Sequence, residues 1–271
     1  MSYRQDFHIH TVFSPDAKSF PRQVVEAAEK AGLNEIMITD HCDCNNGCAF
    51  PPGTQPWPDL DLAAYTAAVE ALQNTANIRV GVGIELGEAD QRPEYSERVL
   101  SFYDWDFVIG SFHNPPGKVD YYYTDYSTLN LKQVMNEYFE GLYRLACDDR
   151  FDVLGHLYYL VRYIYRQNLT VSLSEYNGNI RDIFRVLVKN GRGIEVNTSC
   201  LKDKFAGLIP GFEYLKMFKE CGGEVVTVGT DAHTPDRVGE GVDVAVEAVK
   251  AAGFGCLASF EKRNPVFRDL K

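Results

Sequence analysis

Seven short apolar segments, many of them β-branched, alternate along the chain with longer segments of helical periodicity. This alternation favours a parallel sheet built from βα units, because parallel neighbours need a long crossover connection. The predicted strands are 6–10 (DFHIH), 35–40 (EIMITD), 78–86 (IRVGVGIEL), 106–113 (DFVIGSFH), 152–156 (DVLGH), 193–199 (GIEVNTS) and 224–233 (EVVTVGTDAH).

Helices are predicted between these strands. Pro21 opens and Gly32 closes the first, at 21–31, and Asp61 can cap the second, at 61–74. The others span 91–102, 130–148, 175–190, 211–221 and 240–252. Because no linker or change of composition interrupts the series, we expect a single domain over residues 1–271. Its fold class is α/β, a distorted seven-unit (β/α)7 barrel of the TIM type. An open doubly wound sheet is the main alternative.

All the histidines of the chain lie at the C-terminal ends of predicted strands. These ends meet on one face of a parallel barrel, so the six imidazoles are expected around one pocket. A single histidine there is readily a hydrogen-bonded structural residue, but six together indicate a metal centre. The histidines are His8, His10, His41, His113, His156 and His233.

Carboxylates occur at the same strand ends. Asp16, Glu85 and Asp231 are predicted metal ligands. Asp6 and Asp40 are predicted to contact the ligand residues rather than the metal. Mixed imidazole and carboxylate sites suit Zn, Mn or Fe, so the residues leave the metal open.

The composition limits the possible partners. A formal net charge of −11 argues against nucleic-acid binding, and no apolar run is long enough to cross a membrane. The N-terminus shows no secretory signal pattern, so we expect a cytoplasmic protein whose seven cysteines are thiols. The sequence does not predict an oligomeric state.

Two predicted loops, 42–60 and 114–129, are too long for simple turns and are expected near an active site. The first carries Cys42, Cys44 and Cys48, whose spacing does not match the knuckles of structural zinc sites. Contact of these thiols with a substrate stays open. The second contains YYYTDY, either as pocket lining or as loop packing.

These motifs resemble the PHP (polymerase and histidinol phosphatase) family of metallophosphoesterases over nearly the whole chain. The matching stretches are HIHTVFSPD, TDH at 39–41, GSFH at 110–113, LGH at 154–156 and GTDAH at 229–233. The resemblance implies three divalent ions (Zn, Mn or Fe). One is held by His8, His10, Glu85 and Asp231, a second by Glu85, His113 and His156, and a third by Asp16, His41 and His233.

Within the family, the segments around His156, Asn197 and Asp231 look most like the histidinol-phosphatase branch. The resemblance implies that Arg162 contacts substrate phosphate, and Arg237 is a further candidate for substrate contact. Lys202 stands where the branch has an arginine. Tyr158 also departs from the branch, which has an aspartate there.

The function that this resemblance implies is hydrolysis of a small phosphomonoester, L-histidinol phosphate first, with Asp231 or His233 assisting proton transfer. A multinuclear centre can supply the nucleophile, neutralise phosphoryl oxygens and stabilise the leaving alkoxide. Three alternatives stay open: another small phosphate or a nucleotide as substrate, amide or deaminase chemistry of amidohydrolase barrels, and a non-enzymatic metal-binding protein.

Overall fold

The computed structural model describes residues 2–44 and 50–270. Within them, parallel strands follow one another around a barrel in chain order. The ends of the row meet where Phe7 N donates to Val228 O (2.9 Å) and Ile9 bridges Ala232. The predicted nearly closed seven-stranded barrel is therefore confirmed. Its strands are β1 (Gln5–Asp6), β2 (Glu35–Ile38), β4 (Arg79–Gly87), β5 (Phe107–Ser111), β6 (Val153–Leu154), β7 (Gly193–Asn197) and β8 (Val226–Gly229).

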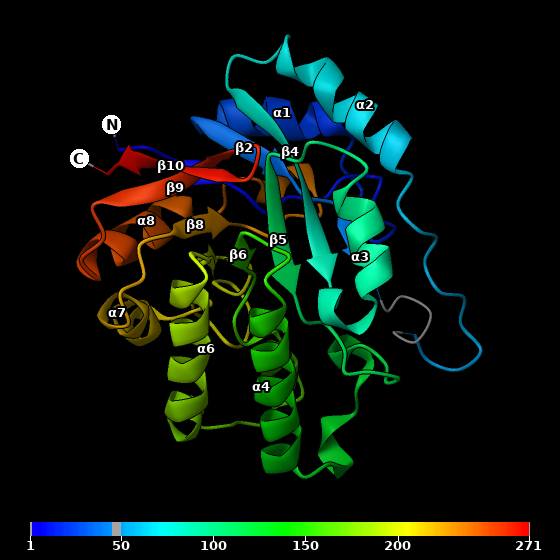
Figure 1. Ribbon diagram of the computed structural model, residues 1–271, viewed down its shortest axis with the longest axis vertical. Helices are drawn as coiled ribbons and strands as arrows, with labels where there is room; N and C mark the ends of the chain where they lie inside the picture. The colour runs from blue at the N-terminus through cyan, green and yellow to red at the C-terminus, as the bar shows by residue number, and fades with distance from the viewer. Residues whose placement is uncertain (1, 45–49, 271) are drawn as a thin grey trace.

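The helices cover the outside of the sheet (Figure 1). Each predicted helix is present, and Asp61 caps the second by accepting a hydrogen bond from Ala64 N (3.0 Å). An additional helix, α5 (Tyr159–Arg166), follows β6. The others are α1 (Pro21–Lys30), α2 (Leu62–Gln73), α3 (Pro93–Leu100), α4 (Leu131–Asp148), α6 (Asn177–Lys189), α7 (Phe212–Glu220) and α8 (Val242–Ala251). None of the helices in the described part of the chain has the length and apolar character needed to cross a membrane.

Short 3-10 helices lie in the connections. They are η1 (Ala89–Gln91), η2 (Tyr121–Tyr123), η3 (Tyr126–Thr128), η4 (Leu173–Tyr176) and η5 (Pro235–Arg237). The segments η2 and η3 fold the YYYTDY loop into two turns, each capped by the aspartate before it: Asp120 accepts from Tyr122 N (2.7 Å) and Asp125 from Ser127 N (3.0 Å). The long loop is thus ordered by its own side chains.

A C-terminal hairpin of β9 (Cys256–Glu261) and β10 (Asn264–Asp269) lies against the N-terminal ends of the barrel strands (Figure 1). Its Ala258 and Phe260 join Phe7, Met37 and Phe107 in the apolar core inside the barrel. The sequence prediction ended at the last helix and lacked this hairpin. It closes the face of the barrel opposite the histidines.

The opposite face is formed by residues just beyond the strands. Several strands are shorter than predicted, since β1 ends at Asp6 and β6 at Leu154. The following residues leave the ladder and carry their side chains across the barrel mouth. A further short strand, β3 (His41–Asp43), continues from β2 and pairs with β4.

Candidate functional site

The first and last barrel strands bring His8, His10 and Asp231 together. The Asp231 Oδ1 atom lies 3.8 Å from His8 Nε2 and 3.4 Å from His10 Nε2. Asp231 has φ 54°, in the left-handed region that non-glycine residues rarely adopt. A Cβ at Gly229 would lie 2.4 Å from His8 Cβ, so a glycine is required for this approach.

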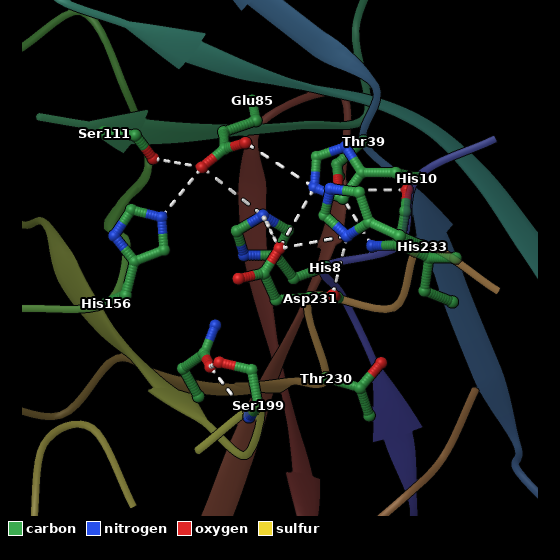
Figure 2. A network of polar contacts seen from close by, with 12 residues as sticks. His8, His10, Thr39, Glu85, Ser111, His156, Ser199, Thr230, Asp231 and His233 are labelled. Atoms are coloured by element: carbon green, nitrogen blue, oxygen red, sulfur yellow. Dashed lines mark hydrogen bonds and ion pairs between the residues drawn. The ribbon is translucent and has the colours of Figure 1, made fainter. Parts of the chain in front are cut away.

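Glu85, on β4, lies at the centre of the cluster (Figure 2). Its carboxylate is fully buried and accepts a hydrogen bond from Ser111 Oγ (2.6 Å). Its other neighbours are imidazole nitrogens. The Oε1 atom lies 2.9 Å from His156 Nε2, 3.2 Å from His113 Nε2 and 3.4 Å from His8 Nε2, and Oε2 lies 2.8 Å from His41 Nδ1 and 3.6 Å from His10 Nε2.

Asp16 and His233 extend the cluster toward the cavity. The Asp16 Oδ2 atom lies 3.0 Å from His233 Nε2 and 3.8 Å from His41 Nε2. The rings of His10 and His233 are 4.3 Å apart between centroids, and those of His10 and His41 are 4.2 Å apart. The structure thus brings all nine predicted ligand residues into one continuous cluster.

One acidic neighbour was missed by the sequence analysis. Asp43 ends β3, and its Oδ1 atom lies 3.3 Å from His113 Nδ1. Together, His41, Asp43 and His113 form one of the groups that can hold a metal ion, beside groups built on His10, Glu85 and their neighbours. The signal was present in the alternation of HCD, since residues 41 and 43 of a strand share a face.

Hydrogen bonds to Nδ1 orient the imidazole rings. A carboxylate or carbonyl can only accept, so His8 donates from Nδ1 to Glu195 (2.6 Å) and His233 donates to the Asp231 carbonyl (2.9 Å). The Ser14 hydroxyl donates to Asp40 (2.6 Å) and therefore accepts from His10 Nδ1 (3.1 Å). In these rings Nε2 carries the lone pair that can bind a metal.

The predicted supporting acids order the backbone around the cluster. Asp40 accepts from the Thr11 amide (2.7 Å) and hydroxyl (2.7 Å). Asp6 accepts from the Thr230 amide (2.9 Å) and hydroxyl (2.6 Å) and from Gly239 N (2.9 Å). These contacts fix the two loops that carry His10 and Asp231.

Mutual electrostatics shift the pKa values in the cluster. Burial opposes ionisation of Glu85, but the imidazoles of His8, His113 and His41 outweigh it and hold the pKa of Glu85 well below its usual range. Burial, with repulsion from His41 and His233, lowers the pKa of His10 to about 3. Glu85 is thus held ionised and His10 neutral, whereas neighbouring carboxylates outweigh burial and raise the pKa values of His8, His41 and His113. These three imidazoles release that proton when they bind a metal.

Several buried atoms at the centre have no hydrogen-bond partner among the described residues. They are Nε2 of His8, Nε2 of His10, Nδ1 of His41 and Oε2 of Glu85. The short approach of His41 Nδ1 to Glu85 Oε2 lacks hydrogen-bond geometry. Buried polar atoms are costly without partners, so this donor set fits divalent cations.

A cavity of about 510 Å³ opens over the cluster. Arg162 of α5 lies on one wall, buried, and donates from Nη1 to Ser199 Oγ (3.1 Å) and Asp231 Oδ2 (3.1 Å). Arg237 and Arg166 lie on the same wall. Lys202 does not line the cavity: its side chain is exposed and pairs with Glu240, so the geometry gives no support to the predicted substrate contact.

The other wall comes from the two long loops. Phe50, Trp57, Tyr122 and Tyr123 line it together with Asp120. Two tyrosines of YYYTDY thus line the cavity, while Tyr121 and Tyr126 are buried in the packing of the loop. Both interpretations of this segment, pocket lining and loop packing, apply to different residues in it.

The thiols of the first loop lie away from this cavity. Cys42 contacts Tyr95 Oη (3.7 Å) and Cys44 contacts Ser96 Oγ (3.1 Å), both beneath the loop. Burial raises the pKa of Cys42 to about 12, so this thiol is not a ready nucleophile. Cys48 lies outside the described residues.

Comparison with known proteins finds relatives that are similar over most of the chain. The family model described as "PHP domain" matches residues 6–199. A probable histidinol-phosphatase of Clostridium acetobutylicum is 30% identical over 237 residues, covering 86% of this chain and 88% of the relative. The histidinol-phosphatase of Lactococcus lactis subsp. lactis is 30% identical over 266 residues, covering 94% and 93%.

A solved structure is also similar over the full length. The crystal structure of histidinol phosphate phosphatase from L. lactis, complexed with zinc, L-histidinol and phosphate, superposes with a TM-score of 0.83. The match covers 97% of this chain and 98% of that chain at 26% sequence identity.

Proposed function

The chain belongs to the PHP domain family, and on that premise we propose that it hydrolyses L-histidinol phosphate to L-histidinol and phosphate. It is a phosphoesterase closely related to histidinol-phosphatases. The observation that carries the proposal is the position of Arg162, a planar donor suited to phosphate, directly beside a buried cluster of imidazoles and carboxylates in one cavity.

The cluster is proposed to hold three divalent ions, and zinc is present in the L. lactis relative. The ligand sets are His8, His10, Glu85 and Asp231 for one ion, Glu85, His113 and His156 for the second, and Asp16, His41 and His233 for the third. When bound, divalent ions supply positive charge opposite the phosphoryl oxygens and acidify a water molecule. The ions would also reverse the local field of an acidic chain.

Arg162 is proposed to hold the phosphate. Its guanidinium is already fixed by Ser199 and by the rings of Tyr159 (4.3 Å) and Tyr163 (5.0 Å), so little side-chain freedom is lost on binding. Arg237 lies farther out, ordered by Glu240 (2.5 Å) and the Ser199 carbonyl (3.1 Å). It is proposed to make a secondary contact with the substrate.

His233 and Asp231 are the groups proposed to move protons. Nδ1 of His233 is committed to the Asp231 carbonyl, so Nε2, which faces Asp16 and the cavity, is the one atom left for either the third ion or a proton. The hydrogen bond with Asp16 outweighs burial and raises the pKa of His233. A proton on Nε2 can be given to the leaving alkoxide oxygen when no ion is bound to that atom.

The test is phosphate release from a panel of phosphomonoesters by protein loaded separately with Zn, Mn or Fe. L-Histidinol phosphate is expected to give the highest kcat/KM. Preference for a nucleotide or a sugar phosphate would favour another PHP phosphoesterase, and no phosphate release from any ester would refute the proposal. Elemental analysis of protein purified without added metal identifies the native ions.

A further inference from the structure

The cavity has walls of opposite charge. Arg162, Arg166 and Arg237 line one wall, and Asp43 and Asp120 line the other. The phosphate of a phosphomonoester is attracted by the arginines and repelled by the carboxylates. Asp43 belongs to a group that can hold a metal ion, but Asp120 has no role in the proposed hydrolysis and calls for a separate explanation.

Asp120 is the carboxylate of this wall that contacts no basic side chain among the described residues, although the charge of His113 acts on it. It accepts from Tyr122 N (2.7 Å) and from the Tyr159 hydroxyl (3.2 Å), and within the described parts of the chain it forms no ion pair. Asp43 differs, because its carboxylate lies against His113 (3.3 Å). A half-buried carboxylate with only neutral donors still attracts a positive charge.

Tyr159 connects the two walls. The Arg162 guanidinium lies over its ring, 4.3 Å from the centroid, and its hydroxyl donates to Asp120. The same ring packs on His113 (4.8 Å) and His156 (4.9 Å). A substrate that lies along Tyr159 therefore has its phosphate at the cluster and its organic end at Asp120.

Aromatic rings surround that organic end. Phe50 is 5.2 Å from Trp57 and 5.9 Å from Tyr123 between ring centroids, and Tyr122 lies 4.9 Å from Tyr123. Aromatic faces beside a carboxylate bind organic cations through the ring quadrupole. They also offer flat apolar surface, which a strongly hydrated inorganic cation does not use.

We infer that Asp120, with the rings of Phe50, Trp57, Tyr122 and Tyr123, forms a subsite for a positively charged organic group. The enzyme would thus select phosphomonoesters whose alcohol part carries a cation, such as an alkylammonium. This inference rests on the proposed phosphatase activity and adds that Asp120 determines the specificity. L-Histidinol phosphate, with its amine, satisfies the requirement.

The test compares two substrates of nearly equal shape, 2-aminoethyl phosphate and propyl phosphate, with metal-loaded protein. The wild type is expected to prefer the cationic ester in kcat/KM. Asp120→Asn keeps an oxygen that can cap η2 but removes the charge, so the ratio of the two kcat/KM values is expected to fall about tenfold or more, mainly through KM.

The matched control is Asp125→Asn. Asp125 caps η3 as Asp120 caps η2, but it is exposed and does not line the cavity. The control should keep the wild-type ratio. An unchanged ratio in Asp120→Asn, or an equal fall in both variants, would overturn the inference and leave Asp120 as a loop cap.

A binding measurement separates this inference from the proposed function. If neither ester is hydrolysed, the proposed phosphatase activity is in doubt for these substrates, but calorimetric titration with L-histidinol still reports on the subsite. Weaker binding by about tenfold in Asp120→Asn alone supports the subsite, and equal binding in all three proteins refutes it.

Discussion

The two ends of the barrel both bury charged residues but treat them differently. At the N-terminal ends of the strands, Glu35 is buried and bonded by Tyr3, Arg79 and Ser259 (2.8 Å), so its oxygens are satisfied within the chain. At the C-terminal ends, Glu85 is equally buried but faces imidazoles, and its Oε2 atom lacks a hydrogen bond among the described residues.

The difference shows how the barrel divides stability from function. The face at the N-terminal ends of the strands, the lower face, is closed by the β9–β10 hairpin. Two buried acids there have an arginine: Arg79 pairs with Glu35, and Arg263 with Asp152 (3.0 Å). The face at the C-terminal ends of the strands, the upper face, leaves buried polar atoms without hydrogen-bond partners among the described residues. This costs stability unless a bound ligand supplies the missing partner. Substitutions of the same type at the two faces should therefore have different consequences.

The largest difference is expected between Glu85→Gln and Glu35→Gln. Removing the central carboxylate charge should empty the metal site and lower kcat/KM by about 10²–10³-fold. Glu35→Gln should retain its metal and instead lose about 1–3 kcal/mol of stability, because the buried hydrogen bonds from Arg79 and Ser259 lose their charged acceptor. Metal content, phosphate release and urea unfolding of both variants check this. Full metal occupancy in Glu85→Gln would contradict the proposed role of Glu85.

Two cations near the upper face allow a sharper test. Arg162→Lys keeps the charge but loses the planar fork, so kcat/KM should fall about 10- to 100-fold, as expected for a lost charge-assisted hydrogen bond. Lys202→Ala, on an exposed residue outside the cavity, should change kcat/KM by less than about twofold. Steady-state kinetics with L-histidinol phosphate measure kcat/KM for both variants. Equal losses in both variants would place the phosphate elsewhere.

Two serines that hydrogen-bond to the charged or metal-binding residues extend the comparison of the two faces. Ser14 accepts from His10 Nδ1 at the upper face, and Ser259 donates to Glu35 at the lower face. Ser14→Ala should weaken metal affinity about tenfold or more, because the His10 ring loses its orientation. Ser259→Ala should cost about 1 kcal/mol of stability with unchanged metal affinity. Competition with a chromogenic chelator measures the affinity, and equal affinities in the two variants would exclude the orienting role.

The upper face was the more predictable of the two from the sequence. Its proposed ligands are chemically distinctive residues at strand ends, and the topology alone brings His8, His41 and Asp231 together. Asp120 and Trp57 were not predicted, because loop conformation, rather than strand register, carries them to the cavity. Lys202 illustrates the same limit, since its position beyond β7 does not fix the direction of its side chain.

The lower face escaped prediction because its turn lacks the usual signal. The β9–β10 hairpin turns at Lys262 and Arg263, both with positive φ (49° and 63°), where Asn-Gly or Asp-Gly is the common sequence. Helix α5 was missed for a related reason. Its YLVRYIYR sequence is dominated by β-branched and aromatic residues, which favour strands, and tertiary packing of the buried Leu160, Val161 and Ile164 decides for the helix.

A further comparison concerns the pH dependence of the lower face. Burial raises the pKa of Asp152 from 3.8 to about 6, against the opposing charges of Arg263 and Arg192. Between these two pH values the folded protein keeps a proton that the unfolded chain loses. The contribution of Asp152 to stability is therefore fully present below pH 3.8 and is lost as the pH rises through about 6.

Asp152→Asn removes this titration. The stability of the wild type relative to the variant should fall by on the order of 1–3 kcal/mol between pH 4 and 6 and stay level above it. Urea unfolding across this range, with chelator present so that the metal centre contributes to neither protein, gives the difference directly. A flat difference would mean that Arg263 fully compensates the buried charge. In that case the arginines of the chain would neutralise the acids of the lower face completely. The upper face would still need a bound cation, so the two faces would differ more than the raised pKa of Asp152 implies.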